Sequence, residues 1–522
     1  MNRRQFLRAG AAAGIGAAAA PNVAKGFVPA HRWDGYDWGT APPVADRLNQ
    51  GPFPQYPPEE VLPGSGVVMA TTPSREIVPG YGMGLVAYVT GDFAGETFQG
   101  IDMEKHVEGM ASLPMGQKLY VRPTWRDIQK RPGRLDPEPY WKATFDAARR
   151  HGRSVGFRVM LSDPDTKAPA LPDFVRERVP MVRLQGEWKR HGREAERAPA
   201  FYEEPRYDHP YFQDAFEELN GLLAAELDGN PLVEFVDTFM YGFWGEGHTW
   251  PFTNHPFPDD ATAERTWVRM FDVQRAHWKK TPLVTNTQPD FSRVGNSELV
   301  DRTIRTHNWL RSDTIFIENE QIEALSNRPP WVAAILEVSI ANGTPEKMEI
   351  DEGVSISDNA IAHVMDLGAN YWSLWNWHEE NAENVLRYYR ERPEMIDAIA
   401  RRIGYRVRPS WIWSYGERSK GQTGLVIGFA NDGIAGVPGV LYVTVRDAAG
   451  RVLVSGGLDP GWPVPGKIRQ ARLPLPPGTD WKGLRLSAEL EVKGVRHPVR
   501  WACHQKLEED GSLRLRPTRG VD

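Results

Sequence analysis

Short apolar runs alternate with helical stretches from about residue 80 to residue 400, and this alternation constrains the fold more than any other feature. The runs have the length of buried strands, and stretches of 10 to 20 residues with helical spacing separate several of them. Strand, helix, strand repeated in this way favours a parallel (β/α)8 barrel, an α/β fold whose active site lies at the carboxyl ends of the strands. The expected strands are 82–90, 118–125, 154–161, 235–243, 282–287, 300–306, 331–336 and 369–378, and the expected helices include 140–151, 211–227 and 261–280.

The chain is too long to fold around a single hydrophobic core. At 522 residues it predicts a barrel with a smaller second module. After residue 409 the pattern changes to short β-rich runs separated by Gly, Pro and Asp, which is typical of an antiparallel sandwich. The predicted division is an irregular arm at 25–80, the barrel at 81–409 and a β-sandwich at 410–522.

The amino-terminal residues predict an export signal. Arg3 and Arg4 precede a Phe-Leu pair and a weakly apolar Ala/Gly run at 9–20. This resembles a twin-arginine signal peptide covering 1–24, which implies the twin-arginine machinery as a partner and a periplasmic or secreted location. The Ala/Gly run is too short for a stable membrane span.

Composition argues against several classes of function. A net charge of -6 provides no basic field for nucleic acid. The sequence contains one cysteine, Cys503, and no His-Glu-x-x-His pair, so no metal site is expected. No Gly-x-Ser-x-Gly elbow or Gly-rich phosphate loop opens a helix, which argues against serine hydrolases and nucleotide enzymes.

Two expected strands end in a glutamate. Glu246 follows 235–243, between two glycines, and Glu337 ends the run 331–336. Glycoside hydrolysis needs one carboxylic acid to protonate the leaving oxygen and a second carboxylate to attack the sugar or to activate water. Glu246 suits the acid, because its neighbour Trp244 would raise its pKa and His248 would orient it. Glu337 suits the nucleophile, because an acid at the end of an apolar strand is costly to bury without a partner.

Other residues are candidates for the same site. Glu318 and Glu320 compete with Glu337 for the nucleophile if the segment 314–320 is the true sixth or seventh strand. Arg122 and Arg158 are candidates to hold a carboxylate nucleophile ionised. His307 and Asn308 are candidate ligands of substrate hydroxyl groups. The candidate sugar-stacking rings are Trp125, Trp372 and Trp375, beside Trp244.

The stretch from residue 120 to 160 resembles the second and third strands of clan A glycoside hydrolases, β-galactosidase-like families with a carboxyl-terminal sandwich. The likeness is carried by Arg122, Trp125, the phrase Pro-Gly then Leu-Asp at 132–136, and Arg158. The Glu246, Glu337 and Trp-rich runs resemble the acid/base, nucleophile and closing strands. Many of those enzymes have Asn before the acid/base, where this chain has Gly245.

This resemblance implies retaining hydrolysis of an oligo- or polysaccharide without a cofactor. Glu337 would attack the sugar, while Glu246 would protonate the leaving group and then activate water. Two alternatives stay open: a non-catalytic carbohydrate-binding barrel, and a polysaccharide lyase or metal-dependent enzyme.

Overall fold

The computed structural model describes most of the chain from residue 67 to residue 516. The described residues are 67–89, 102–189, 195, 198–287, 296–312, 324–339, 349–351, 354–355, 363–375, 383, 386, 389–390, 393–417 and 422–516. The predicted signal peptide at 1–24 and the rival carboxylates Glu318 and Glu320 lie outside these residues. The side chain of Trp375 is also outside the described part.

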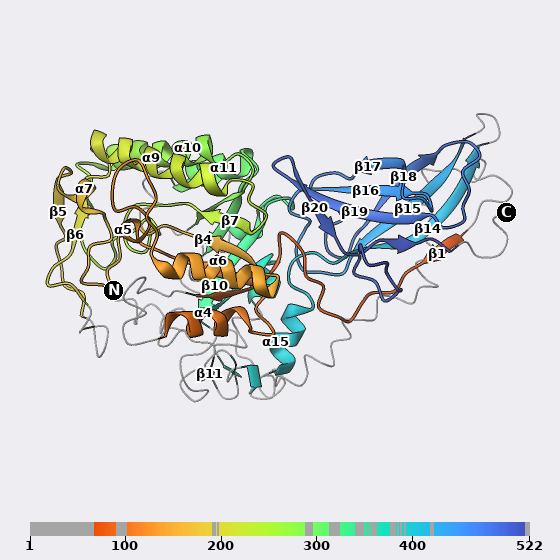
Figure 1. Cartoon of the computed structure of the whole chain (residues 1–522), viewed down its shortest axis with the longest axis horizontal. Helices are drawn as coiled ribbons and strands as arrows, with labels where there is room; N and C mark the ends of the chain where they lie inside the picture. Colours follow the sequence, from red (N-terminus) through yellow and green to blue (C-terminus); the bar gives the residue numbers. More distant parts are fainter. Residues whose placement is uncertain are drawn as a thin grey trace, which may run out of the picture.

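Eight parallel strands form a closed barrel, and this confirms the predicted fold class (Figure 1). Each strand pairs with the next in chain order, and β13 pairs with β2 to close the ring. The barrel strands are β2 (Gly84–Tyr88), β3 (Lys118–Val121), β4 (Ser154–Phe157), β7 (Val233–Asp237), β8 (Leu283–Asn286), β9 (Trp309–Ser312), β10 (Ala334–Ser339) and β13 (Tyr371–Trp375).

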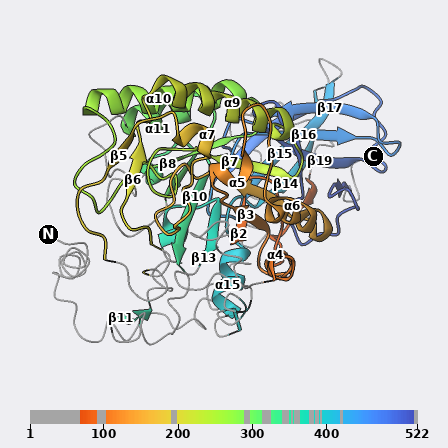
Figure 2. The ribbon, with the colours of Figure 1, turned by 60° about the vertical axis from the view of Figure 1, so that its left-hand side comes forward.

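Helices cover the outside of the barrel, and α9, α10 and α11 lie side by side along one flank (Figure 2). The predicted helix 140–151 is confirmed as α6. It begins with Pro139 in its first turn and ends at Gly152, whose left-handed φ of 62° stops the helix. The helices are α4 (Met103–Ala111), α5 (Trp125–Ile128), α6 (Pro139–His151), α7 (Asp173–Arg176), α9 (Pro210–Leu227), α10 (Asp260–His277), α11 (Asn296–Arg305) and α15 (Pro393–Ala400).

The predicted sixth strand at 300–306 is wrong. These residues belong to α11, and the sixth barrel strand is β9, which begins at Trp309. In α11, Leu299 and Thr303 are buried, and the Thr303 hydroxyl lies 2.7 Å from the Thr285 hydroxyl of β8. A spacing of four residues between buried positions is helical, and it outweighs the strand-like composition of this run.

Large apolar side chains fill the middle of the barrel. Tyr120, Phe235, Ile335 and Tyr371 belong to one buried cluster that continues into the sandwich. Gly156 leaves room for this packing, because a Cβ there would lie 2.2 Å from the Phe235 ring. The interior is therefore a packed core, and polar chemistry is confined to its two ends.

Two antiparallel sheets form the sandwich. One has the strand order β1-β14-β15-β18, and the other has β17-β16-β19-β20 with β21 beside β19. Strand β1 comes from the segment expected to be an irregular arm, and it pairs with β14. The strands are β1 (Val67–Ala70), β14 (Val407–Glu417), β15 (Gln422–Asn431), β16 (Val440–Arg446), β17 (Val452–Gly457), β18 (Ile468–Leu475), β19 (Arg485–Val492), β20 (Val495–Val499) and β21 (Leu513–Arg514). Two further small hairpins are β5 (Met181–Arg183) with β6 (Glu203–Pro205), and β11 (Glu349–Asp351) with β12 (Val354–Ser355).

The sandwich packs on the amino-terminal end of the barrel. Lys493, in the turn between β19 and β20, donates to the carbonyl of Trp278 at 2.8 Å and to Asn308 Oδ1 at 3.0 Å. Beside it, His497 stacks on Tyr81 with ring centroids 3.5 Å apart. The carboxyl ends of the barrel strands therefore face away from the sandwich.

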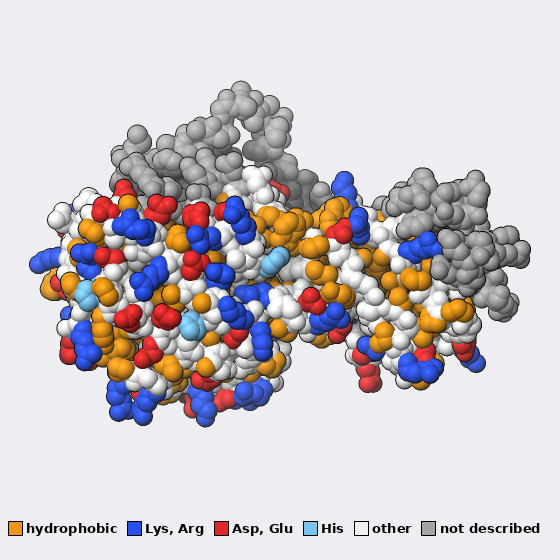
Figure 3. Space-filling view, turned by 90° about the horizontal axis from the view of Figure 1, so that it is seen from above, with side chains coloured by type: hydrophobic (Ala, Val, Ile, Leu, Met, Phe, Trp, Pro, Cys, Tyr) orange, Lys and Arg blue, Asp and Glu red, His pale blue; other side chains and the backbone are white. Residues whose placement is uncertain are grey.

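The space-filling view shows two lobes joined by a narrower waist, with acidic and basic side chains intermingled over the larger lobe (Figure 3). That face has no single-sign patch of the kind that attracts nucleic acid. Within the described residues, no helix is both long enough and apolar enough to cross a membrane.

Candidate active site

The loop that follows β7 turns sharply and brings Glu246 to the carboxyl end of the barrel. Backbone φ is positive at Gly242 (79°), Trp244 (53°), Gly245 (74°) and Gly247 (86°). Gly242 is required, because a Cβ there would lie 2.1 Å from the carbonyl oxygen of His248. The loop closes on itself where the Phe243 amide donates to that same oxygen at 2.8 Å. A non-glycine residue in a left-handed conformation is strained, and such strain concentrates at functional sites.

Glu246 lies among three basic side chains. Its Oε1 atom is 3.4 Å from Arg122 Nη1 and 3.3 Å from Arg158 Nη1, and its Oε2 atom is 3.3 Å from His248 Nε2. These separations are longer than those of the tightest charge-assisted hydrogen bonds, so Glu246 is held by several moderate contacts and not by one short ion pair. At 10% exposure its side chain is the most accessible of the carboxylates gathered here.

Glu337 lies in β10 and is almost completely buried. Its Oε2 atom forms an ion pair with Arg311 Nη2 from the neighbouring strand β9. Arg311 also donates to the Tyr88 hydroxyl at 2.6 Å, and its guanidinium lies over the Tyr120 ring at 5.2 Å. The ion pair with Arg311, which has several buried partners of its own, therefore holds Glu337 in position.

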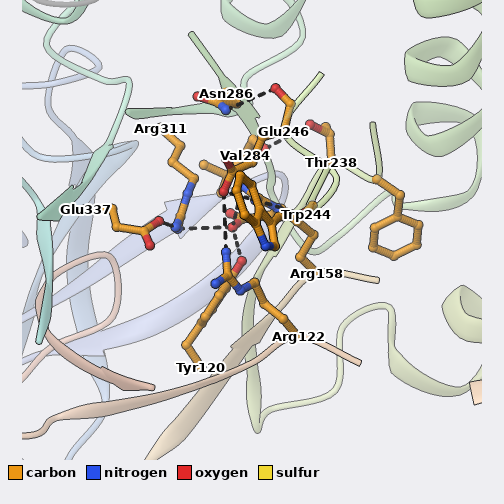
Figure 4. A network of polar contacts seen from close by, with 12 residues as sticks. Tyr120, Arg122, Arg158, Thr238, Trp244, Glu246, Val284, Asn286, Arg311 and Glu337 are labelled. Atoms are coloured by element: carbon orange, nitrogen blue, oxygen red, sulfur yellow. Dashed lines mark hydrogen bonds and ion pairs between the residues drawn. The ribbon is translucent and has the colours of Figure 1, made fainter. Parts of the chain in front are cut away.

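Asp237, at the end of β7, joins the two glutamates into one network. Its Oδ2 atom is 3.4 Å from Arg158 Nη2 and 3.1 Å from Arg311 Nη1, and it also accepts a hydrogen bond from the Tyr120 hydroxyl. Burial raises the pKa of Tyr120, so this hydroxyl stays a donor at neutral pH. Figure 4 shows the resulting arginine–carboxylate cluster, in which Arg311 lies beside Glu337, and Arg122 and Arg158 lie beside Glu246. Its members are Arg122, Arg158, Asp237, Glu246, Arg311 and Glu337.

The cluster carries three positive and three negative formal charges, and five of its six side chains are at most 4% exposed. Burying this many charges is tolerable where each one has a partner of opposite sign. The backbone around Glu246 is held as well: Asn286 Nδ2 donates to the Glu246 carbonyl at 3.3 Å, and Trp244 Nε1 donates to Asp165 Oδ2 at 2.9 Å. A charge-balanced, rigid site is suited to stabilising charge that moves during a reaction.

The predicted roles of Arg122 and Arg158 need correction. Both were expected to hold the nucleophile, but they contact Glu246, and Arg158 also contacts Asp237. The arginine on Glu337 is Arg311, which the sequence analysis passed over because strand six was placed too early. His248 contacts Glu246 as expected, whereas the Trp244 ring lies against the His248 ring and its Nε1 donates to Asp165.

Two tryptophans expected to stack on sugar belong to the core. Trp125 is completely buried against Phe212 and Phe174, and its Nε1 donates to Gln129 Oε1 at 2.9 Å. Trp372 is also completely buried and faces outward from β13 into the apolar layer under the helices. Neither ring is available to a ligand.

His307 and Asn308 are at the wrong end of the barrel for substrate binding. They precede β9, so they lie at its amino-terminal end. Asn308 is completely buried, and its Oδ1 accepts hydrogen bonds from the Leu283 amide at 2.9 Å and from Lys493 of the sandwich. The expectation failed because it followed from the misplaced sixth strand.

Asp237, Asn286 and the tyrosines that contact the arginines were not predicted from the sequence. A signal for Asp237 was present, because it interrupts the apolar run 235–243. A charged residue inside an otherwise apolar strand is costly to bury unless it is paired. The same argument applies to Arg311 in the run Trp-Leu-Arg-Ser at 309–312.

A cavity of about 450 Å³ lies next to this site, between the segment that follows β4 and the β5–β6 hairpin. Its walls include Ser162, Asp163, Tyr202, Glu204 and Phe243, and neither Glu246 nor Glu337 lines it. In the described part of the chain, no group of three or more His, Cys, Asp or Glu side chains has the arrangement of a metal site.

Comparison with known proteins yields similar barrels of low sequence identity. No protein-family model and no curated protein matches the chain. A GH5_18 protein from Streptomyces cattleya is 13% identical over 57% of this chain and 71% of its own, with a TM-score of 0.36. Endo-glycoceramidase II from a Rhodococcus species is 12% identical over 77% of this chain and 100% of its own, with a TM-score of 0.36. The catalytic domain of β-amylase from Paenibacillus polymyxa is 8% identical over 60% of this chain and 98% of its own, with the same TM-score. At such low identity none of the three assigns an activity to this chain.

Proposed function

We propose that this protein is a glycoside hydrolase that cleaves an oligo- or polysaccharide with retention of configuration, using Glu337 and Glu246. The observation that carries the proposal is the arginine–carboxylate cluster. It brings a glutamate from β10 and a glutamate from the loop after β7 into one ion-pair network at the carboxyl ends of the barrel strands. In barrels of this type, that end is where catalytic residues lie.

Glu337 is the proposed nucleophile, because its ion pair with Arg311 keeps the carboxylate in place. One of its oxygens attacks the anomeric carbon as the glycosidic C–O bond breaks, and Glu246 gives its proton to the leaving oxygen. Water then attacks the glycosyl ester, Glu246 takes a proton from that water, and Glu337 leaves as a carboxylate. The greater exposure of Glu246 suits the residue that meets both leaving group and water.

The test begins with a glycan-library screen of the purified protein. Each glutamate is then substituted, and the kcat of each variant is measured on the best substrate. Glu246→Gln and Glu337→Gln are each expected to lower kcat by about a thousandfold or more while the protein stays folded. Glu298→Gln is the control, because Glu298 pairs with Arg302 on the surface of α11. Full turnover by either active-site variant would refute the assignment of that residue.

One observation favours a second candidate, a non-catalytic carbohydrate-binding barrel. Each of the three carboxylates in the cluster contacts an arginine, as in a purely structural ion network. This candidate predicts that the parent protein binds a glycan, releases no product, and binds equally well after Glu246→Gln.

Export through the twin-arginine pathway belongs to the same proposal. It is supported by the residue pair Arg3 and Arg4 ahead of the Ala/Gly run. Replacing both arginines by lysine is expected to retain the protein in the cytoplasm, which cell fractionation measures. Unchanged export of that variant would contradict this part of the proposal.

A further inference from the structure

A second buried glutamate lies behind the Glu246 loop. Glu204, in β6, is completely buried. Its Oε1 atom accepts a hydrogen bond from Ser162 Oγ at 2.5 Å, and its Oε2 atom accepts one from the Tyr207 hydroxyl at 2.5 Å. Both partners are neutral hydroxyl groups, in contrast to the arginines that contact Glu246 and Glu337.

Tyr207 and Ser162, the two residues that carry these hydroxyl groups, also form hydrogen bonds with the backbone of the loop 242–248. The Tyr207 hydroxyl accepts a hydrogen bond from the Gly242 amide at 2.9 Å. The Ser162 carbonyl accepts one from the Trp244 amide at 2.9 Å, and Ser162 forms a parallel bridge with Phe243. A single carboxyl group therefore ties together the chain segments beneath residues 242–244, where the loop begins.

The loop returns to the same place through His248. The His248 carbonyl lies over Gly242 and accepts the Phe243 amide, while the His248 ring contacts Glu246 Oε2 at 3.3 Å. The Tyr207 hydroxyl, from the segment after β6, contacts Glu204 directly, and the charge of His248 in the loop also acts on Glu204, because it lowers the pKa of this carboxyl group. Burial raises the pKa of Tyr207, so its hydroxyl remains protonated and donates at every pH of interest.

Glu204 changes its charge in the physiological range. Burial raises its pKa to about 7, against the opposing effects of the two hydroxyl donors and of His248. When Glu204 is ionised it attracts the charged form of His248, and when it is protonated this attraction is lost. The contact between His248 and Glu246 therefore depends on the state of a carboxyl group outside the arginine–carboxylate cluster.

We propose that Glu204 is a positioning residue for Glu246, acting through Tyr207 and Ser162 on the loop backbone and through His248 on the Glu246 carboxylate. The chemical consequence for Glu246 rests on the proposed function. The coupling between Glu204 and His248 does not, because it is a property of the folded protein without substrate.

The experiment follows the titration of His248 by NMR in the full-length protein with labelled histidine, the His248 signals being assigned with His248→Gln. Glu204→Gln keeps the size of the side chain and removes its charge, so the pKa of His248 is expected to fall relative to the parent. Glu203→Gln, one position along the same strand, is the control and is expected to leave this titration unchanged. An identical His248 titration in the parent and in Glu204→Gln would overturn the proposal.

A kinetic measurement separates this inference from the assignment of Glu246. For a substrate that the parent cleaves, Glu204→Gln is expected to shift the pH profile of kcat near neutrality with little change in KM. Tyr207→Phe removes the link to Gly242 without changing charge, so it is expected to lower kcat about tenfold at all pH values. If the parent cleaves no glycan, the proposed function fails and the NMR titration still decides the coupling. If an active Glu204→Gln variant had the same pH profile of kcat as the parent, the positioning role of Glu204 would be refuted. The assignment of Glu246 would be unaffected.

Discussion

At the scale of the residue, the proposed site depends on how three arginines are shared among three carboxylates. Arg311 holds Glu337 and Asp237, Arg158 links Asp237 to Glu246, and Arg122 contacts Glu246 alone among the three acids. Arg311 is therefore the residue on which the proposed nucleophile depends most.

Arg311→Met is expected to lower both activity and stability. It leaves Glu337 without its ion-pair partner and removes one of the two arginines on Asp237, and breaking a buried ion pair in this way costs about 3 to 5 kcal/mol. Urea unfolding measures the stability, and the best substrate from the glycan screen measures kcat. Arg302→Met, on the surface of α11, is the control. If Arg311→Met lowered stability no more than Arg302→Met does, the buried ion pair would contribute little to stability.

The pKa of Glu204 predicts how stability depends on pH. Its folded value of about 7 lies above the ordinary value of 4.5, so the folded state keeps the proton longer than the unfolded chain does. The contribution of this group is thus fully present below about pH 4.5 and is lost as the pH rises to about 7, a change of roughly 3 kcal/mol.

Urea unfolding of the parent and of Glu204→Gln at several pH values measures this effect. The free energy of unfolding of the parent, relative to that of the variant, is expected to fall across this window and to level off above it. A constant difference between the two proteins would contradict the raised pKa.

The sequence alone predicted that Glu246 and Glu337 lie at the same end of the barrel, because each lies at or just beyond the end of an apolar strand, and the ion-pair network joins the two residues. The sequence did not identify which arginine pairs with which acid. The side chains of Arg122, Arg158 and Arg311 meet the same group of carboxylates, and their pairing depends on side-chain conformations that local sequence does not specify. Glu204 carried no signal, because its strand has three residues and lies in a polar insertion.

At the scale of the element, the loop 242–248 links the fold to the chemistry. Its shape needs glycine at position 242, where positive φ and contact with His248 coincide. The strands themselves were largely predictable, since buried parallel strands are continuous apolar runs. The sixth strand was not, because the last turns of α11, just before it, contain the β-branched residues Val300, Thr303 and Ile304, which also suit a strand.

Gly242→Ala is expected to abolish most activity and to lower the melting temperature. The added Cβ would lie 2.1 Å from the His248 carbonyl oxygen, so the loop must move and carry Glu246 with it. Gly133→Ala is a matched control: φ is also 79° there, but a Cβ would have no heavy atom within 4 Å. The control is expected to lose about 1 to 2 kcal/mol of stability from backbone strain alone. If Gly242→Ala and Gly133→Ala lost equal amounts of stability and both kept their activity, the contact between position 242 and His248 would be unimportant.

At the scale of the whole molecule, the sandwich closes the end of the barrel opposite the proposed site. The Lys493 ammonium group reaches the carbonyls of Trp278 and Thr281 and the side chain of Asn308, and burial lowers its pKa to about 8. Lys493 and Gly494 both have positive φ, which matches a two-residue hairpin turn pointing at the barrel. Nothing in the sequence of this turn indicates what it contacts, because two of the three partner groups are backbone carbonyls, which every residue carries.

Lys493→Met is expected to destabilise the protein by about 1 to 3 kcal/mol, since it removes the ammonium donor from the carbonyls of Trp278 and Thr281 and leaves Asn308 Oδ1 with the Leu283 amide. Calorimetry measures the loss, and kcat on a cleaved glycan is expected to change little because the site is at the far end of the barrel. Lys467→Met, at an exposed position, is the control. A large fall in kcat without a fall in stability would place Lys493 in the chemistry and contradict this division of the molecule.

The measurement that tests the central claim most directly is covalent labelling of the nucleophile. Once a cleaved glycoside is known, a fluorinated analogue of that sugar with a good leaving group is added, and the labelled peptide is identified by mass spectrometry. We expect a glycosyl ester on Glu337 in the parent and also in Glu246→Gln, because a good leaving group departs without a proton from Glu246. A label on another carboxylate, or unimpeded turnover by Glu337→Gln, would contradict it.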